Sequence, residues 1–348
     1  MASPPRVSIV LPTYNRRPRL ARVLAGLDRQ SAPAQSFEVV IVDDGSTDDT
    51  ERWLVDNRQR AYAVYPIRQA NGGPARARNT GVAAAHGELL LFIDDDVEPT
   101  PELVSEHLRS HDSEKDVVVI GPLASLEHYD QPWVAWEQAK VEAQYSAMLR
   151  GDWEPTFRQF WTGNASVGKE HVIAAGGFDP ALLRAEDVDL GRRLHERGLR
   201  FRFNPAARGL HHAERSLEAW IKMHRAYGTL EVQIFGAFGD DYLIDILAGN
   251  FGRIHPATRW LVGHCATHPG RQAVVTSILS GWLRLAAATG VDVATGKVCG
   301  ALANLIYWQA SVAALGEART ARTFQRGDEI RRQERQSTVS VATPSPRA

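Results

Sequence analysis

The sequence LLLFIDDDVE, Leu89 to Glu98, places five large apolar residues directly before three consecutive carboxylates. Because residues 89–93 do not alternate with polar ones, they predict a strand buried on both faces. The acids then lie at the carboxyl end of that strand, where open α/β sheets bind ligands. Adjacent acids repel one another unless a cation lies among them, and their hard oxygen atoms suit Mg²⁺ or Mn²⁺. The stretch by itself also fits a polar loop in which one aspartate caps the next helix.

Strand and helix patterns alternate through the first part of the chain. Strand patterns over residues 7–11, 37–42 and 61–67 are followed by helix patterns over residues 19–30, 50–57 and 75–86. Such alternation is typical of parallel strands joined by right-handed crossovers. We therefore predict an α/β fold in which residues 6–110 form a Rossmann-like half, with a mostly parallel sheet flanked by helices.

Three of the expected strands end in side chains that suit ligand binding. Tyr14 follows the first strand and offers a ring that can stack on a base. Asp44 follows the second strand and can accept the imide N–H of uracil, and the acids 94–96 follow the fourth. The carboxyl ends of parallel strands meet at one edge, so these side chains are expected to converge. Neither GxGxxG nor GxxxxGK[ST] occurs, which argues against a dinucleotide fold or a P-loop.

Several motifs together resemble the family-2 glycosyltransferases with the GT-A fold. The resemblance covers about residues 6–225 and rests on these segments, in order: Pro12-Thr13-Tyr14-Asn15-Arg16, Val42-Asp43-Asp44-Gly45-Ser46-Thr47-Asp48, Gly72-Gly73-Pro74-Ala75-Arg76-Ala77-Arg78-Asn79, Phe92-Ile93-Asp94-Asp95-Asp96, Gly163-Asn164-Ala165-Ser166, Gly176-Gly177-Phe178-Asp179 and Ala185-Glu186-Asp187-Val188-Asp189-Leu190. It implies a nucleotide-diphosphate sugar donor, a divalent metal (Mg²⁺ or Mn²⁺) and inversion at the anomeric carbon.

The resemblance also assigns roles to individual positions. The expected donor-nucleotide residues are Pro12, Tyr14, Asn15, Asp44, Arg76, Arg78, Asn79, Asp94 and Asp95. Metal ligands are expected at Asp94 and Asp96, completed by His211 or His212. Simpler interpretations stay open here: the two arginines also fit a solvated helix face, and each histidine also fits an ordinary loop.

The pair Glu186-Asp187 matches the family position of the general base. An acceptor hydroxyl is a poor nucleophile until a positioned carboxylate takes its proton. We expect Asp187 to be this base, with Glu186 as a helper or acceptor contact. The alternative is a pair of acids that complement the dipole of a helix over residues 188–197. Trp161, Gly163 and Asn164 resemble the segment that lines the donor or acceptor sugar.

The domain plan follows from where these motifs end. Residues 111–228 are expected to form the acceptor and catalytic half of a domain over residues 1–228, followed by a helical extension over residues 229–324 and a disordered tail over residues 325–348. Residues 298–315 hold no charge, which meets the lower length limit of a membrane-spanning helix. Because polar side chains interrupt this stretch, we interpret residues 273–315 as a buried or interfacial helical hairpin, with peripheral membrane contact as its expected role.

Composition narrows the class of protein. The formal net charge of −1 gives no global basic field, so no nucleic acid partner is expected. Cys265 and Cys299 lack CxxC spacing and indicate core residues in a reducing compartment. The residues before the first strand are too few and too polar for a signal peptide. We therefore expect a cytoplasmic protein, peripheral at the inner face of the membrane if the hairpin touches lipid.

The leading hypothesis is an inverting glycosyltransferase that uses a UDP-sugar, or a dTDP-sugar through the same Asp44 contact. The QxxRW signature of processive synthases is absent, which favours addition of one sugar. One rival is a sugar nucleotidyltransferase, but residues 12–16 do not resemble its GxGTR-type loop. Another is a non-catalytic nucleotide-sugar-binding protein, which would be marked by loss of the acids. Natural products, lipid-linked sugars and cell-envelope glycans all fit as acceptors, and the sequence indicates no oligomeric state.

Overall fold

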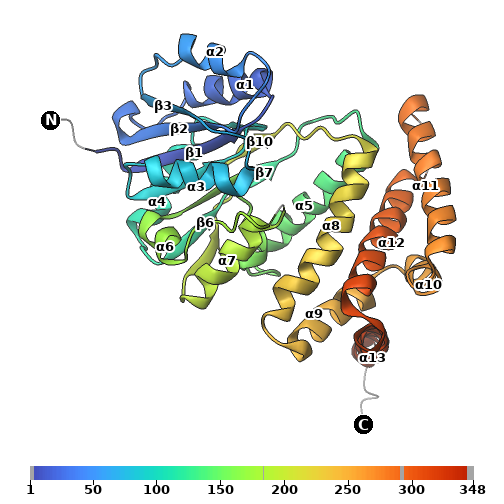
Figure 1. Cartoon of the computed structure of the whole chain (residues 1–348). Helices are drawn as coiled ribbons and strands as arrows, with labels where there is room; N and C mark the ends of the chain where they lie inside the picture. The colour runs from blue at the N-terminus through green and yellow to red at the C-terminus, as the bar shows by residue number, and fades with distance from the viewer. Residues whose placement is uncertain (1–3, 183, 291–293, 343–348) are drawn as a thin grey trace. The chain divides into compact units, whose positions relative to one another are not determined.

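The computed structural model describes residues 4–182, 184–290 and 294–342 (Figure 1), with backbone only for 334–342. The chain divides into two compact units. The first, here the sheet unit, comprises Met1–Tyr129 and Glu137–Glu214. The second, the helical unit, comprises Asp130–Trp136 and Arg215–Ala348.

Among its described residues, the sheet unit contains a seven-stranded sheet in the order β3-β2-β1-β4-β8-β6-β9. The strands are β1 (Val7–Thr13), β2 (Phe37–Asp43), β3 (Ala63–Arg68), β4 (Leu89–Ile93), β6 (Val117–Ile120), β8 (Asn164–Gly168) and β9 (Arg200–Phe203). The pairs of β1 with β2 and β4, of β2 with β3, and of β6 with β9 are parallel. Only β8 runs against its neighbours β4 and β6 within this described sheet. The expected α/β architecture with a mostly parallel sheet is confirmed.

Helices cover both faces of this sheet (Figure 1). Apolar residues of α1 (Arg17–Leu27) and α4 (Leu103–Asp112) pack on one face, and those of α3 (Pro74–Ala84), α6 (Lys169–Ala174) and α7 (Glu186–Glu196) pack on the other. The short helix α2 (Thr50–Asp56) follows β2. Every residue of β2 is buried, as is expected for a strand with helices on both sides.

A small second sheet lies next to the acidic stretch in sequence. Its order is β5-β10-β7, with β5 (Val97–Pro99), β10 (Gly209–His211) and β7 (Leu123–Ala124). Strand β10 runs antiparallel to β5 and pairs His211 with Val97. The pairing continues one step further, because His212 N donates to Asp96 O at 2.8 Å. This register brings a segment more than 100 residues away to the end of the acidic stretch.

The helical unit contains α8 (Leu217–Gly236), α9 (Asp240–Arg253), α10 (Pro256–Cys265), α11 (Pro269–Thr289), α12 (Thr295–Leu315) and α13 (Glu317–Ala342). Helices α8 and α12 approach closely: a Cβ at Gly228 would lie 2.2 Å from Tyr307 O. In the same contact, Ser311 Oγ donates to Gly228 O at 3.0 Å. Helices α9 and α13 are joined by ion pairs, among them Arg319–Asp240 at 2.8 Å and Arg326–Asp245 at 3.1 Å.

Two domain predictions differ from this arrangement. The boundary expected between residues 228 and 229 falls inside α8, and the sheet unit ends at Glu214. The disordered tail expected over residues 325–348 is wrong for residues 325–342, which belong to α13. Local composition suggested disorder there, but α13 gains partners on α9 that lie about 80 residues earlier in the chain. Residues 343–348 lie outside the described part of the chain.

Helix α12 is the one helix of the described residues that is long and apolar enough to cross a membrane. Its mean hydropathy is 1.4, and half of the apolar window is buried inside the structure. A mostly buried core helix of a water-soluble protein passes the same test. The expectation of a buried or interfacial hairpin over residues 273–315 corresponds in position to α11 and α12.

The contact between α3 and β1 gives a stability prediction. A Cβ at Gly81 would lie 2.5 Å from Val10 Cγ1, and the branched side chain of Val10 has little freedom on a strand. We expect Gly81→Ala to lower the free energy of unfolding by about 1 kcal/mol, because overpacking costs about 1–3 kcal/mol and alanine returns about 1 kcal/mol of helix propensity. Urea unfolding monitored by circular dichroism measures this change.

A double-mutant cycle provides the control for this contact. Val10→Ala removes the opposing methyl groups, so the double variant Val10→Ala/Gly81→Ala should lose less stability than the sum of the two single losses. Strict additivity would mean that the two residues do not meet, and the close packing of α3 on β1 would be wrong.

Candidate active site

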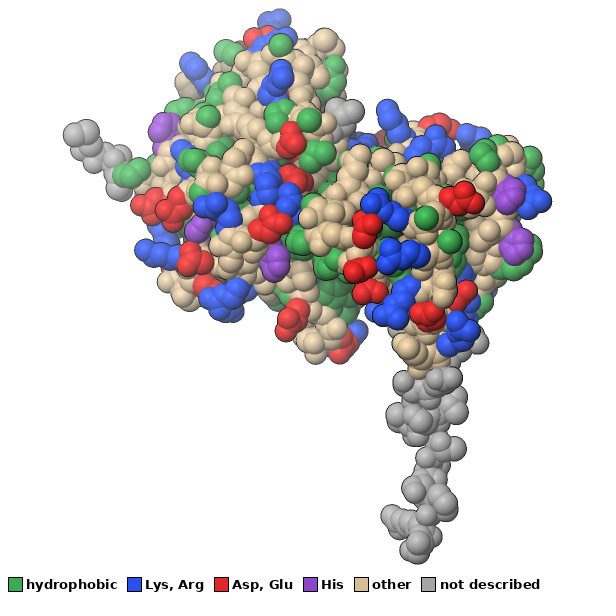
Figure 2. Space-filling view, turned by 60° about the horizontal axis from the view of Figure 1, so that its bottom comes forward, with side chains coloured by type: hydrophobic (Ala, Val, Ile, Leu, Met, Phe, Trp, Pro, Cys, Tyr) green, Lys and Arg blue, Asp and Glu red, His purple; other side chains and the backbone are tan. Residues whose placement is uncertain are grey.

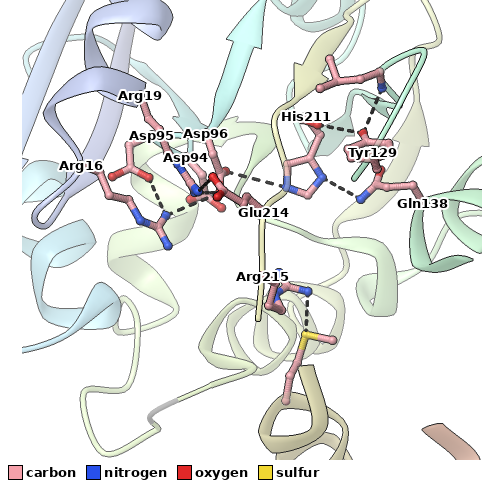
Figure 3. Close-up of polar contacts among 12 residues, drawn as sticks. Arg16, Arg19, Asp94, Asp95, Asp96, Tyr129, Gln138, His211, Glu214 and Arg215 are labelled. Atoms are coloured by element: carbon pink, nitrogen blue, oxygen red, sulfur yellow. Dashed lines mark hydrogen bonds and ion pairs between the residues drawn. The ribbon is translucent and has the colours of Figure 1, made fainter. Parts of the chain in front are cut away.

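The three consecutive acids after β4 lie in three different environments (Figure 3). Asp95 is buried and accepts hydrogen bonds from Thr13 Oγ1 and from an Arg16 terminal nitrogen, both at 2.8 Å. Burial raises the pKa of Asp95 to about 6, although Arg16 opposes the shift. Asp95 therefore ties the end of β4 to the end of β1. Its expected contact with the donor nucleotide stays a prediction, although burial leaves little of this carboxylate open to a direct contact.

Asp96 has longer contacts with its charged neighbours. Terminal nitrogens of Arg16 and Arg19 each lie 3.5 Å from its Oδ2 atom. The Nε2 atom of His211 lies 3.8 Å from its Oδ1 atom. Arg19 is also held by Glu214, at 2.8 Å. The positive charge that three adjacent acids require is therefore supplied in part by two arginines, whose role here was missed from the sequence.

The structure separates the two candidate histidines. The ring of His211 faces Asp96 on one side, and its Nδ1 atom lies 2.9 Å from Gln138 Nε2 on the other (Figure 3). The ring of His212 instead lies against Glu98, with 3.0 Å between Nε2 and Oε2. Of the two, His211 is the one brought to the acids, because side chains alternate across the extended segment that carries them.

The residues present fit a divalent cation in one arrangement. No group of three His, Cys, Asp or Glu side chains suited to a metal occurs among the described residues. A carboxylate and an imidazole do occur, and their facing atoms are 3.8 Å apart. Bonds to Mg²⁺ are about 2.0–2.1 Å long, so one ion can contact both atoms. Mg²⁺ is usually held by one or two carboxylates and completed by substrate phosphates and water, and Asp96 with His211 suits such a site.

Arg78 joins the acids after β4 to those of α7. Its two terminal nitrogens lie 2.7 Å from Asp94 and 2.7 Å from Glu186. Burial alone lowers the pKa of Arg78, but the two acids more than offset this, so its pKa lies above the ordinary value. Arg78 is thus an internal bridge and not part of a solvated helix face, and its expected contact with the diphosphate stays a prediction. Arg76, on the opposite side of α3, is exposed.

The pair Glu186-Asp187 opens α7 after an unusual backbone conformation. Ala185 has φ of 57°, a left-handed conformation that alanine rarely adopts. Glu186 is buried against Arg78, and Asp187 is partly buried, with Oδ1 accepting from Val188 N at 2.8 Å. Burial and the neighbouring Glu186 raise the pKa of Asp187, while Arg78 opposes the shift. A raised pKa suits a carboxylate that has to take a proton.

Asp44 and Asn15 each accept hydrogen bonds that hold neighbouring loops in place. Asp44 is buried and accepts from Gln69 Nε2, Gly72 N and Gly73 N at 2.7–2.9 Å. Those three bonds fix the loop before α3 and leave about one acceptor position on the carboxylate. Asn15, with φ of 54°, accepts from Thr47 N at 2.7 Å and so ties the loop after β1 to the loop after β2. The expected donor contact of each residue stays a prediction.

Asn79 and Asn164 make structural hydrogen bonds, and their expected contacts with the donor nucleotide and with the sugar stay predictions. The Asn79 amide donates to Phe178 O at 2.7 Å and accepts from Phe178 N at 2.8 Å. These two hydrogen bonds connect α3 to the segment before α7. Asn164 is buried: its amide nitrogen donates to Pro122 O and Ala207 O, and its oxygen lies 2.9 Å from His107 Nε2. Both side chains are taken up by structural bonds. The sequence pattern showed polar residues near a site, but not which way they point.

The remaining candidates lie where a ligand can reach them or close beside the acids. Tyr14 is 43% exposed after β1, and Pro12 is partly buried. A Cβ at Gly163 would lie 3.3 Å from Asp94 Oδ2, so this glycine allows close packing against the acid. Trp161 is partly buried, with its ring 6.3 Å from that of Tyr145. Besides Arg16 and Arg19, Gln138 was missed, because a glutamine within a helix gives no local signal of what it contacts.

Comparison with known proteins finds glycosyltransferases. The protein-family model described as Glycosyl transferase family 2 matches residues 8–168. A glucosyltransferase of validoxylamine A from Streptomyces hygroscopicus subsp. jinggangensis is 33% identical over 226 residues, covering 56% of this chain and 52% of the relative. The uncharacterized glycosyltransferase YfnE of Bacillus subtilis is 29% identical over 245 residues, covering 57% and 62%. The chain thus matches between half and two thirds of the length of these relatives.

Solved structures share the fold over most of the chain. The mannosyltransferase PcManGT from Pyrobaculum calidifontis, in complex with GDP-Man and Mn²⁺, has a TM-score of 0.58 and 19% identity, covering 90% of this chain and 88% of its own. Residues 1–349 of TarS from S. aureus, in complex with UDP-GlcNAc, have a TM-score of 0.54 and 18% identity, covering 94% and 92%. The GT-A architecture expected from the motifs is therefore confirmed. Residues 8–168, which carry most of these motifs, are therefore similar to glycosyl transferase family 2.

Proposed function

We propose that this protein transfers one sugar from a nucleoside diphosphate donor to an acceptor hydroxyl, with inversion at the anomeric carbon. The observation that carries the proposal is the bridge of Arg78 between Asp94 and Glu186, each at 2.7 Å. It holds the acids that suit a diphosphate-bound cation and the acids that suit a general base in one site. Among related structures, TarS is solved with UDP-GlcNAc and PcManGT with GDP-Man, which supports a nucleotide sugar as donor class.

The chain's own residues divide the work as follows. Tyr14 would stack on the base, and the remaining acceptor position of Asp44 would take an imide N–H, which favours uridine and also fits thymidine. Asp96 and His211, with Asp94 nearby, would hold Mg²⁺ or Mn²⁺. When bound, that ion neutralises charge on the departing diphosphate. Asp187 would take the proton of the attacking hydroxyl, and Glu186 keeps Arg78 oriented beside it.

The products distinguish this proposal from its rivals. Incubation with UDP-sugars and Mn²⁺ should release UDP. A nucleotidyltransferase would instead form or consume pyrophosphate, and a binding protein would release neither. Charges of both signs are mixed on the visible face in Figure 2.

Replacement of the base tests the catalytic assignment. We expect Asp187→Asn to lower the rate of UDP release by roughly 10²–10⁴-fold, because an amide cannot take the proton. The dissociation constant for UDP should stay near the wild-type value, since Asp187 is not assigned to the nucleotide. A coupled UDP assay and calorimetry measure the two quantities.

Asp189→Asn is the matched control for this substitution. Asp189 lies on the same helix and pairs with Arg192 and Arg193 at 3.1 and 2.8 Å. Its replacement should cost some stability but leave UDP release largely intact. If Asp187→Asn retained the full rate of UDP release, the assignment of Asp187 as base would be lost.

Removal of the cation tests the metal assignment. Wild-type protein should bind UDP more tightly with Mn²⁺ than with EDTA, and Asp96→Ala should bind it weakly under both conditions, because the cation then lacks its carboxylate. His212→Ala serves as control, since that ring lies against Glu98. The same Mn²⁺-dependent gain in Asp96→Ala as in wild type would contradict the role of Asp96.

We also propose peripheral contact between the helical unit and an anionic membrane, at the inner face of the cell membrane. On α11, Val274, Ile278 and Leu285 are each at least 60% exposed and recur at helical spacing on one face. Arg271 and Arg284 flank that face in helical position, and Trp260 on α10 is 64% exposed. Apolar side chains between basic ones are typical of helices that lie on anionic lipid.

Residues 246–316 as a whole support an anionic partner. They contain five lysine or arginine residues and a single acid, Asp292. Arg284 is paired with Glu218 at 2.6 Å and Arg259 with Asp328 at 3.2 Å, which reduces the excess charge without reversing it. An anionic bilayer therefore fits this surface in both its charge and its apolar character.

Vesicle sedimentation tests the membrane surface. Wild-type protein should bind vesicles containing phosphatidylglycerol, bind less as salt is raised, and bind poorly to neutral phosphatidylcholine. Ile278→Glu/Leu285→Glu should abolish binding, whereas Val55→Glu, at a 57% exposed position on α2, should not. If the double variant instead converted a dimer to a monomer and wild type ignored the vesicles, this face would be a self-association surface and the membrane proposal would fail.

A further inference from the structure

Gln138 contacts the one candidate cation ligand that is not a carboxylate. It belongs to α5 (Pro132–Leu149), is buried, and places Nε2 2.9 Å from His211 Nδ1 (Figure 3). Its Oε1 atom is buried and has no hydrogen-bond partner among the described residues. The backbone of His211 is held independently, because Tyr129 Oη donates to His211 O at 2.9 Å. Gln138 therefore acts on the ring and not on the position of the strand.

The direction of this hydrogen bond decides where the ring proton lies. An amide nitrogen can only donate, so Nδ1 of a neutral His211 has to accept, and the ring proton is then on Nε2. Nε2 is the atom that faces Asp96 Oδ1 at 3.8 Å. A nitrogen that carries a proton has no lone pair for a cation. In this orientation of the amide, His211 is suited to the carboxylate and not to a metal.

If the amide turns by half a rotation, its Nε2 and Oε1 atoms exchange places and the direction of the hydrogen bond with His211 Nδ1 is reversed. Oε1 would then accept from Nδ1–H, and Nε2 would present its lone pair toward Asp96. The ring loses one proton from Nε2 and gains one at Nδ1, both by exchange with water, so its charge is unchanged. In both orientations the amide keeps its hydrogen bond to Nδ1, and the Oε1 atom that would accept has no hydrogen-bond partner at present among the described residues. A glutamine permits both states, whereas a glutamate would permit only the second.

We propose that Gln138 is a positioning residue that sets the tautomer of His211 and so makes Nε2 available to the cation. The inference rests on the proposed function, because it concerns the ion expected at Asp96 and His211. Partners of this kind, bonded to the far nitrogen of a metal-binding histidine, typically change metal affinity by about 10–100-fold when they are removed.

Metal affinity tests the proposal without reference to turnover. Mn²⁺ binding in the presence of saturating UDP is measured from the spectrum of free Mn²⁺ by electron paramagnetic resonance. Gln138→Met keeps the volume of the side chain but has no amide, and should weaken Mn²⁺ binding by about 10–100-fold. Gln138→Glu should restore at least wild-type affinity, because a carboxylate accepts from Nδ1–H. Gln144→Met makes the same change on the same helix, at a partly buried position, and should have no effect.

Nitrogen NMR separates failure of this inference from failure of the proposed function. With ¹⁵N-histidine labelling and no metal, His211, identified by its loss in His211→Ala, should show the Nε2–H tautomer in wild type and the Nδ1–H tautomer in Gln138→Glu. Equal tautomers in the two proteins, or equal Mn²⁺ affinity in wild type and Gln138→Met, would overturn the role of Gln138. If wild type bound no Mn²⁺ while the tautomers changed as expected, the metal assignment would fail and the tautomer control would stand.

Discussion

The buried guanidinium of Arg78 is the interaction on which the site depends. It lies between Glu186, whose side chain is buried, and Asp94, whose side chain is 37% exposed. Breaking its buried pair with Glu186 costs about 3–5 kcal/mol, because uncompensated charge is left behind. The position of Arg78 depends in turn on α3. Gly81 lets that helix approach β1, and Asp44 fixes the loop from which the helix starts.

Several motif residues hold together the backbone segments around the site. Asn79 holds the backbone of Phe178, Asn15 holds Thr47, and Asn164 holds two carbonyl groups, so their side chains are engaged before any ligand arrives. Short amide and carboxylate side chains suit this work, because irregular loops contain backbone N–H and C=O groups that no strand or helix satisfies. A polar motif residue beside a site can therefore serve equally well to hold the backbone in place or to contact the ligand.

The sequence predicted the features of the fold that depend on short-range patterns of residues. Apolar runs marked β2 and β4, and the family resemblance implied that the acids after β4 share a site with Glu186 and Asp187 at the start of α7. It did not predict that α13 continues past residue 325, since that helix packs closely on α9, where a Cβ at Gly327 would lie 2.9 Å from Ala248 O. Nor did it choose between His211 and His212, because the choice is made by the register of β10 on β5. These outcomes depend on contacts between residues about 80 or more positions apart, which leave no local periodicity.

The acidic stretch shows how three adjacent carboxylates can coexist. The three acids lie in a turn in which Val97 N donates to Asp94 O at 3.1 Å. Their side chains meet different partners: Arg78 for Asp94, Thr13 with Arg16 for Asp95, and Arg16, Arg19 and His211 around Asp96. The contacts of Asp94 and Asp95 are 2.7–2.8 Å long, whereas those of Asp96 with its charged neighbours are 3.5–3.8 Å. Electrostatic attraction weakens with distance, so replacing these charged neighbours by another cation costs least at Asp96. An incoming cation would therefore compete with these longer ion pairs at Asp96, while Asp94 and Asp95 keep the framework in place.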